Sequence, residues 1–148
     1  MKKLTLTFFA GLTAFALTAF AEPTWTTDFP AAQTQAKKDK KLILMNFTGS
    51  DWCGWCIKLK KEVFDTKEFA DYVKDNVVLV DVDFPTRKPQ SAELKKANEG
   101  LKAKYRAEQG FPTIIVLNSE GKEVWRQVGY MKGGPKAWID KLNEVKKN

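Results

Sequence analysis

The chain has 148 residues, of which 25 are lysine or arginine, 18 are aspartate or glutamate and none is histidine, giving a formal net charge of +7 at pH 7. The absence of histidine excludes a cysteine–histidine hydrolase and removes a common partner of zinc-binding cysteines. The lysines mostly share their predicted helices with acidic residues, so the charge indicates solubility rather than a nucleic-acid-binding surface.

The N-terminus has the pattern of an export signal. Lys2 and Lys3 precede an uncharged run over residues 4–19, and Ala19-Phe20-Ala21 offers small residues at the positions that a signal peptidase recognises. The apolar run is short for a membrane span, and no positive cluster follows it to favour an uncleaved anchor. We therefore expect residues 1–21 to be removed as a signal peptide and the protein to be exported, to the periplasm in a bacterium.

The remaining residues, 22–148, suit one domain with one core. Asp28 is placed to cap a first helix, and Asp65 and Glu68 have capping-box spacing before a third. In chain order we expect a helix over 29–38, a strand over 42–47, helices over 53–64 and 65–75, a strand over 77–84, a helix over 91–107, strands over 113–117 and 122–128, and a helix over 136–146.

This order of elements predicts an α/β fold. Helices that connect consecutive strands imply parallel pairing, whereas the turn over residues 118–121 predicts an antiparallel hairpin at one edge. We expect a central mixed sheet of four to five strands with helices on both faces.

Chemistry is concentrated in Cys53 and Cys56, the only cysteines of the chain. Residues three apart on the first turn of a helix lie on one face, close enough for their sulfurs to bond. A structural disulfide is disfavoured because so small a loop removes little entropy from the unfolded chain. Zinc would need further ligands, and covalent haem attachment would need histidine where Ile57 stands. The spacing therefore favours thiol–disulfide exchange.

The two sulfurs are expected to do different work. Cys53 lies at the helix start, where free backbone N–H groups and the helix dipole stabilise a thiolate. We predict that Cys53 is the exposed nucleophile and that Cys56, one turn deeper, resolves the mixed disulfide.

The run Trp52-Cys53-Gly54-Trp55-Cys56 after an apolar strand, together with Phe111-Pro112-Thr113 before another, resembles the thioredoxin superfamily over nearly the whole mature chain. The longer string from Asn46 to Cys53 is similar to exported bacterial thioredoxin-like disulfide reductases. The resemblance implies a thioredoxin-like fold and a cis peptide bond at Pro112, which would pack beside the cysteines and leave neighbouring backbone free to pair with an extended substrate. The alternative is a simple strand-entry turn.

The resemblance and the aromatic residues together suggest a substrate-binding surface around the cysteines. Trp52, Gly54, Trp55, Phe111 and Thr113 are the expected contact residues, with the two indoles forming an apolar rim. An alternative is that Trp52 packs against the domain and only Trp55 is exposed.

One position departs from the family pattern. Thioredoxin has a buried aspartate on the strand before the motif, where this chain has Asn46. Asp81 falls on the neighbouring strand, so it is a candidate for the proton relay to Cys56. The alternative is that Asp81 is a solvated strand residue.

The direction of electron flow is predicted from the residues between the cysteines. Gly54-Trp55 supplies no imidazolium to favour a strongly oxidising disulfide, so we expect a protein-disulfide reductase. It would act on protein or peptide thiols and disulfides, receive electrons from a membrane partner, and work as a monomer without a cofactor other than its own disulfide. An oxidase or isomerase, and a peptide-binding or chaperone-like module with a structural disulfide, remain alternatives.

Overall fold

The computed structural model describes residues 22–147, so the predicted signal peptide lies outside the described residues. The elements are β1 (Trp25–Thr26), α1 (Phe29–Asp39), β2 (Leu42–Thr48), α2 (Gly54–Leu59), the π-helix η1 (Lys60–Phe64), α3 (Lys67–Asn76), β3 (Val77–Asp83), α4 (Ala92–Lys104), β4 (Thr113–Leu117), β5 (Glu123–Val128) and α5 (Gly134–Lys146). No helix among residues 22–147 is long and apolar enough to cross a membrane.

The strands form one mixed sheet in the order β1-β3-β2-β4-β5. Strand β3 is parallel to both β1 and β2, whereas β4 is antiparallel to β2 and β5. The expected α/β fold with a mixed sheet and an antiparallel hairpin is thus confirmed. All seven residues of β2 are buried, as expected of a central strand covered on both faces.

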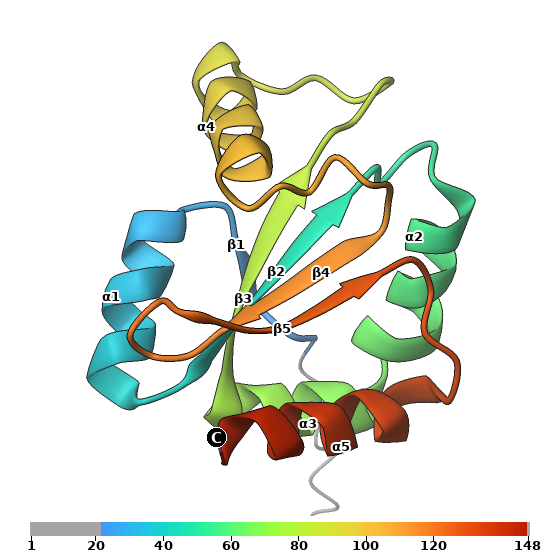
Figure 1. Ribbon diagram of the computed structural model, residues 1–148. Helices are drawn as coiled ribbons and strands as arrows, with labels where there is room; N and C mark the ends of the chain where they lie inside the picture. Colours follow the sequence, from blue (N-terminus) through green and yellow to red (C-terminus); the bar gives the residue numbers. More distant parts are fainter. Residues whose placement is uncertain (1–21, 148) are drawn as a thin grey trace, which may run out of the picture.

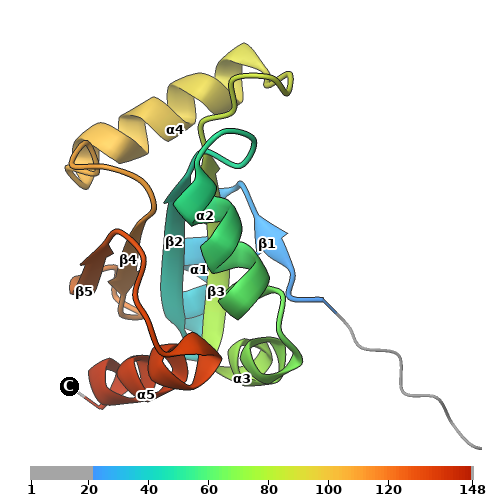
Figure 2. The ribbon, with the colours of Figure 1, turned by 90° about the vertical axis from the view of Figure 1, so that its right-hand side faces the viewer.

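Two hydrophobic clusters occupy the two faces of this sheet. The helices that cover these faces are seen from the front in Figure 1 and from the side of α2 in Figure 2. Leu44 and Leu79 belong to the cluster under α2, η1, α3 and α5, in which Trp138 is fully buried. Met45 and Val80 belong to the cluster under α1, completed by residues near the end of α4. Side chains along a strand alternate between faces, so odd and even positions of β2 serve different cores.

Three local features differ from the sequence expectations. Strand β1 was not predicted, because two residues carry no periodicity; Trp25 in it packs on Phe64 with ring centroids 5.2 Å apart. The helix over 53–64 turns from α into π geometry at Lys60. The cap of α3 is Thr66, whose hydroxyl accepts from the Phe69 N–H, so the Asp65–Glu68 capping box was wrong by one residue.

The connections that matter for the site all meet at one end of the sheet. Strands β2, β3 and β5 end there, and β4 begins there (Figure 1). The loop before α2, the β3–α4 loop, the turn before β4 and the β5–α5 turn therefore share this edge. In open α/β sheets this is the edge at which ligand sites are usually built.

Candidate active site

The cysteine pair lies at the start of α2, just after the loop that follows β2. Cys53 and Cys56 form a disulfide with their Cα atoms 5.2 Å apart. The Cys53 N–H donates to the Gly49 carbonyl at 2.9 Å, which fixes the tight turn before the helix. The i, i+3 geometry expected from the spacing is what the structure shows.

Helix position distinguishes the two sulfurs more than exposure does. Cys53 and Cys56 are 7% and 5% exposed in the disulfide form, so neither stands out toward solvent. Cys53 is the N-cap of α2, and its Sγ accepts from the Cys56 N–H at 3.2 Å. Gly54 is exposed between them, with open space around it. A thiolate at Cys53 would therefore form where a backbone donor already points.

Trp52 packs against the domain and still shows 46% of its surface. Its indole N–H donates to the Phe84 carbonyl at 2.8 Å, and its ring lies edge-on to Phe111 at 5.8 Å. Phe111 in turn stacks on Phe84 at 5.4 Å. A Cβ at Gly49 would come within 2.3 Å of the Trp52 ring, so only glycine leaves room for the indole to pack against the backbone at this position. Trp52 therefore packs against the domain and, unlike in the alternative that left only Trp55 exposed, also reaches the surface.

Trp55 is the most exposed large hydrophobic side chain among the described residues, at 58%. Its ring lies 5.6 Å from that of Tyr130, which follows β5. The Lys58 ammonium sits over both rings, 5.4 Å from the Trp55 centroid and 5.1 Å from that of Tyr130. These residues, with Gly129 and Lys132, line a groove of about 640 Å³. One of its lining residues, Trp55, lies between the two cysteines in the sequence.

The turn before β4 closes the other side of the site. The Phe111–Pro112 peptide bond is cis, and the Pro112 carbonyl accepts from the Gly129 N–H at 2.8 Å. Thr113 differs from expectation, because it is fully buried and its hydroxyl donates to the Gly110 carbonyl at 2.6 Å. Its side chain therefore braces the turn and is not part of the surface.

Asn46 and Asp81 are register partners on β2 and β3. They continue the rows that contain Leu44 and Leu79, so both side chains face the side of the sheet covered by α2. The Asn46 amide donates to Asp81 at 3.4 Å. Burial, and then the charge of Asp83, raise the pKa of Asp81 to about 6, against the opposing hydrogen bond from Asn46. Asp81 is thus a partly buried carboxyl rather than a solvated strand residue.

Asp51 is a site residue that the sequence did not reveal. Its carboxylate accepts the backbone N–H groups of Thr86, Arg87 and Lys88 at 3.0, 2.7 and 2.9 Å. The hydrogen bond from Thr86 above all, then those from Arg87 and Lys88, lower the pKa of Asp51 to about 2. These partners lie some 35 residues downstream in another loop, so no local signal announces them.

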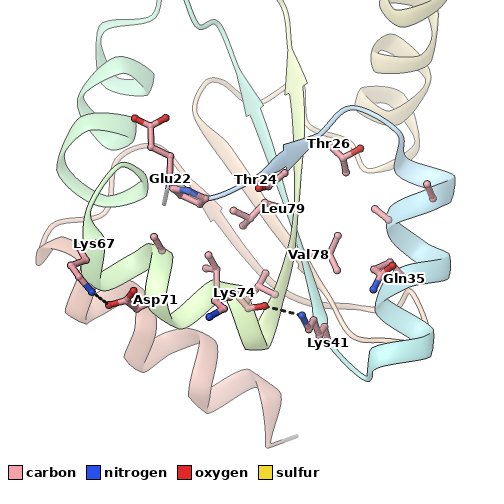
Figure 3. Close-up of a pocket in the computed structure, with 16 residues that line it drawn as sticks. Glu22, Thr24, Thr26, Gln35, Lys41, Lys67, Asp71, Lys74, Val78 and Leu79 are labelled. Atoms are coloured by element: carbon pink, nitrogen blue, oxygen red, sulfur yellow. Dashed lines mark hydrogen bonds and ion pairs between the residues drawn. The ribbon is translucent and has the colours of Figure 1, made fainter. Parts of the chain in front are cut away.

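A second groove lies away from the cysteine pair. About 860 Å³ opens beside the β3 edge, between α1 and α3, with Lys41 donating to the Lys74 carbonyl across it (Figure 3). It contains no cysteine and lies at the opposite end of β3 from the disulfide. Among residues 22–147 no group of three or more acidic or cysteine side chains is arranged to hold a metal ion.

Comparison with known proteins places this site in a family. A family model described as a thioredoxin-like domain matches residues 29–146. The disulfide bond reductase DsbH of Chlamydia pneumoniae is 36% identical over 119 residues, covering 80% of this chain and 70% of DsbH. The thioredoxin-related protein DsbJ of the same organism is 33% identical over 102 residues, which are 69% of this chain but 29% of DsbJ.

Solved structures agree with the sequence matches. A DsbH oxidoreductase structure has a TM-score of 0.80 and 34% identity, and the match covers 95% of each chain. A thioredoxin from Thermus thermophilus, at 17% identity and a TM-score of 0.60 over 84% of this chain and 88% of that one, shares the fold. The chain therefore belongs to the thioredoxin-like family, and it carries the cysteine pair of a thiol–disulfide oxidoreductase.

Proposed function

We propose that the protein is a periplasmic protein-disulfide reductase that acts on exported proteins through Cys53 and Cys56. The observation that carries this proposal is the helix-capping role of Cys53, whose sulfur accepts the Cys56 N–H. The same donor and the positive end of the α2 dipole favour a thiolate over a thiol at Cys53, and the thiolate is the nucleophile in exchange.

The exchange proceeds in two balanced steps. The Cys53 thiolate attacks one sulfur of a substrate disulfide, forms a mixed disulfide and releases the other substrate sulfur as a thiolate. Cys56 then loses its proton and attacks the Cys53 sulfur, which reforms the Cys53–Cys56 disulfide and releases the second substrate sulfur. Two electrons pass from the enzyme to the substrate. A dithiol protein must then return them, and we propose a membrane partner for that role.

Substrate binding is assigned to the surface around the disulfide. Trp52 and Trp55 are exposed and lie on either side of Cys53 in the sequence, and the Trp52 ring contacts that of Phe111. Gly54 has no side chain to obstruct an approaching peptide. An extended substrate is proposed to pair with the backbone at Phe111–Pro112, in the strand-addition mode by which sheets bind peptides.

The residues around the cysteines support the proposed direction of electron flow. Gly54-Trp55 supplies no cation between them, and the nearby Lys60 pairs with Asp65. The Cys53 thiolate therefore lacks an imidazolium between the cysteines, which would make the disulfide strongly oxidising, and we place its potential near the thioredoxin value of about −270 mV. Exchange of this kind needs no dissociable cofactor.

Export is proposed from the signal-peptide pattern of residues 1–21. A signal peptide would deliver the protein to a compartment where disulfides form, which is where a reductase of misoxidised proteins is needed. One domain of this size can act as a monomer.

The deciding experiment is the reduction potential of the pair, equilibrated against glutathione and dithiothreitol, with insulin reduction as the activity assay. A potential near that of thioredoxin with insulin turnover supports a reductase. A potential well above the glutathione couple would instead identify an oxidase or isomerase. Cys53→Ala tests the third reading, because an exchange enzyme loses turnover whereas a peptide-binding module keeps its partner.

A further inference from the structure

We infer that the groove formed by Trp55, Lys58, Tyr130 and Lys132 selects substrates that carry a carboxylate side chain close to the cysteine under attack. The inference rests on the proposed exchange function and adds a substrate class to it. The ligand is an aspartate or glutamate of an extended peptide, seated on an aromatic floor between two ammonium groups.

The groove is positioned to contact whatever reaches the disulfide. Trp55 lies between Cys53 and Cys56 in sequence, and Lys58 lies one helical turn beyond Trp55 on the same face. Tyr130 comes from the turn after β5, which is tied to the cis-proline turn through the Gly129–Pro112 hydrogen bond. A peptide bonded to Cys53 therefore has this groove beside it within a few residues.

Lys58 has donor capacity left for a ligand. Its ammonium is held over the rings of Trp55 and Tyr130, and its nearest carboxylate, Glu62, is 3.9 Å away. Glu62 also accepts the Tyr130 hydroxyl, and this hydrogen bond above all raises the pKa of Tyr130, so the phenol stays neutral. An ammonium has three donors, and Lys58 donates no hydrogen bond to any residue in the described part of the chain.

Lys132 supplies the second positive charge. It lines the groove in the turn between β5 and α5, and within residues 22–147 it has neither a hydrogen-bond partner nor an ion-pair partner. Two ammonium groups with donors left over, beside an aromatic floor, attract a carboxylate and repel a lysine or arginine.

Charges on the other side of the cysteines have the same sign. Arg87 and Lys88 lie in the β3–α4 loop, which Asp51 links by hydrogen bonds to the loop before α2. Three backbone N–H groups already engage the Asp51 carboxylate, so it offers little to a cationic substrate. An acidic peptide thus meets a predominantly basic rim on both sides of Cys53.

The test uses three peptides of one sequence, each linked through a single cysteine to a neutral chromogenic thiol, with glutamate, glutamine or lysine near that cysteine. The reduced full-length mature protein is mixed with each peptide, and the second-order rate constant is measured at low and high salt. We expect the glutamate peptide to react about twofold to tenfold faster than the glutamine peptide, the lysine peptide more slowly, and the differences to shrink with salt.

The variants remove the groove charges. In Lys58→Gln/Lys132→Gln the glutamate-to-glutamine rate ratio should fall close to one, and in Lys58→Glu/Lys132→Glu it should invert. Using the ratio within each variant cancels any change in the reactivity of Cys53 itself. Lys95→Gln, an exposed lysine on α4, is the matched control and should keep the wild-type ratio.

Two results would overturn the inference: a wild-type ratio of one, or a ratio that the double glutamine variant leaves unchanged. 2-Hydroxyethyl disulfide, which has no charge and no peptide, separates this failure from that of the proposed function. If the reduced wild-type protein does not reduce it, the exchange activity itself is wrong.

Discussion

At the scale of single residues, the site is distinguished by an amide and a carboxyl that face each other from two neighbouring strands. Position 46 carries an amide, and the carboxyl lies opposite it at Asp81 on the face covered by α2. Burial and the nearby Asp83 charge bring the pKa of Asp81 to about 6, within the range where a carboxylate can accept a proton near neutral pH. The resolving step needs such an acceptor, because Cys56 must lose its proton to attack.

We predict that Asp81→Asn slows resolution of the mixed disulfide by roughly tenfold to a hundredfold near neutral pH, the range expected when a general base is lost. The wild-type rate should rise through an inflection near pH 6, the pKa of Asp81, and the variant should lose that inflection. Stopped-flow decay of a preformed mixed disulfide at Cys53 measures this rate directly.

The rescue variant uses the strand register. Asn46→Asp/Asp81→Asn moves the carboxyl back across the β2–β3 pair and should recover much of the rate, because the two positions are partners on the same face. If Asp81→Asn leaves the pH profile of the resolution rate unchanged, Asp81 is not the proton acceptor and Cys56 transfers its proton to solvent.

At the scale of elements, two loops from different strand ends are fastened together beside the disulfide. Asp51 accepts three N–H groups of the β3–α4 loop, and Ser50 donates both its N–H and its hydroxyl to Asp83, at 2.9 and 2.6 Å. The Trp52 indole adds a third link to Phe84. One wall of the site is therefore the β3–α4 loop, whose conformation depends on side chains of the loop before α2.

We predict that Asp51→Ala frees this loop without unfolding the domain. The backbone amides of Thr86, Arg87 and Lys88 lose their acceptor, so their hydrogen exchange should accelerate severalfold while amides of β2 and β4 keep their protection. NMR-detected exchange on the oxidised protein measures both sets. Asp71→Ala, which removes an exposed carboxylate on α3, is the control, and equal exchange rates in the two variants would mean that Asp51 does not hold the loop.

These elements also show which features the sequence could predict. The strands over 42–48 and 113–117 are nearly continuous apolar runs bounded by turns, so pattern alone located them within a residue. Strand β1 has two residues and exists only because β3 offers an edge to pair with. The Asp51 contact joins loops far apart in the chain, and the burial of Thr113 depends on β4 lying between two neighbours, so both required the folded topology.

At the scale of the whole molecule, the Asp81 carboxyl, the proposed proton acceptor for Cys56, is expected to lower the stability of the oxidised fold. Burial above all raises the pKa of Asp81 from its ordinary value of 3.8 to about 6 in the folded protein. Below about pH 4 the carboxyl is protonated in both states, and between the two pKa values the folded state holds a proton that the unfolded chain has lost. Above about pH 6 the folded state bears a partly buried charge. The contribution of Asp81 ionisation to the free energy of unfolding therefore falls from zero below pH 4 to its full destabilising value above pH 6.

We predict that replacing Asp81 by Asn removes this pH dependence. The difference in unfolding free energy between Asp81→Asn and wild type should shift in favour of the variant between about pH 4 and pH 7, by an amount of the order of 3 kcal/mol for a shift of about two pKa units. Urea unfolding of both oxidised proteins across that range measures it, and subtraction cancels the titration of the shared carboxyls. Asp140→Asn, on the exposed face of α5, is the control substitution. A difference independent of pH would mean that Asp81 ionises in the fold as it does in water, and the proton relay would lose its physical basis with it.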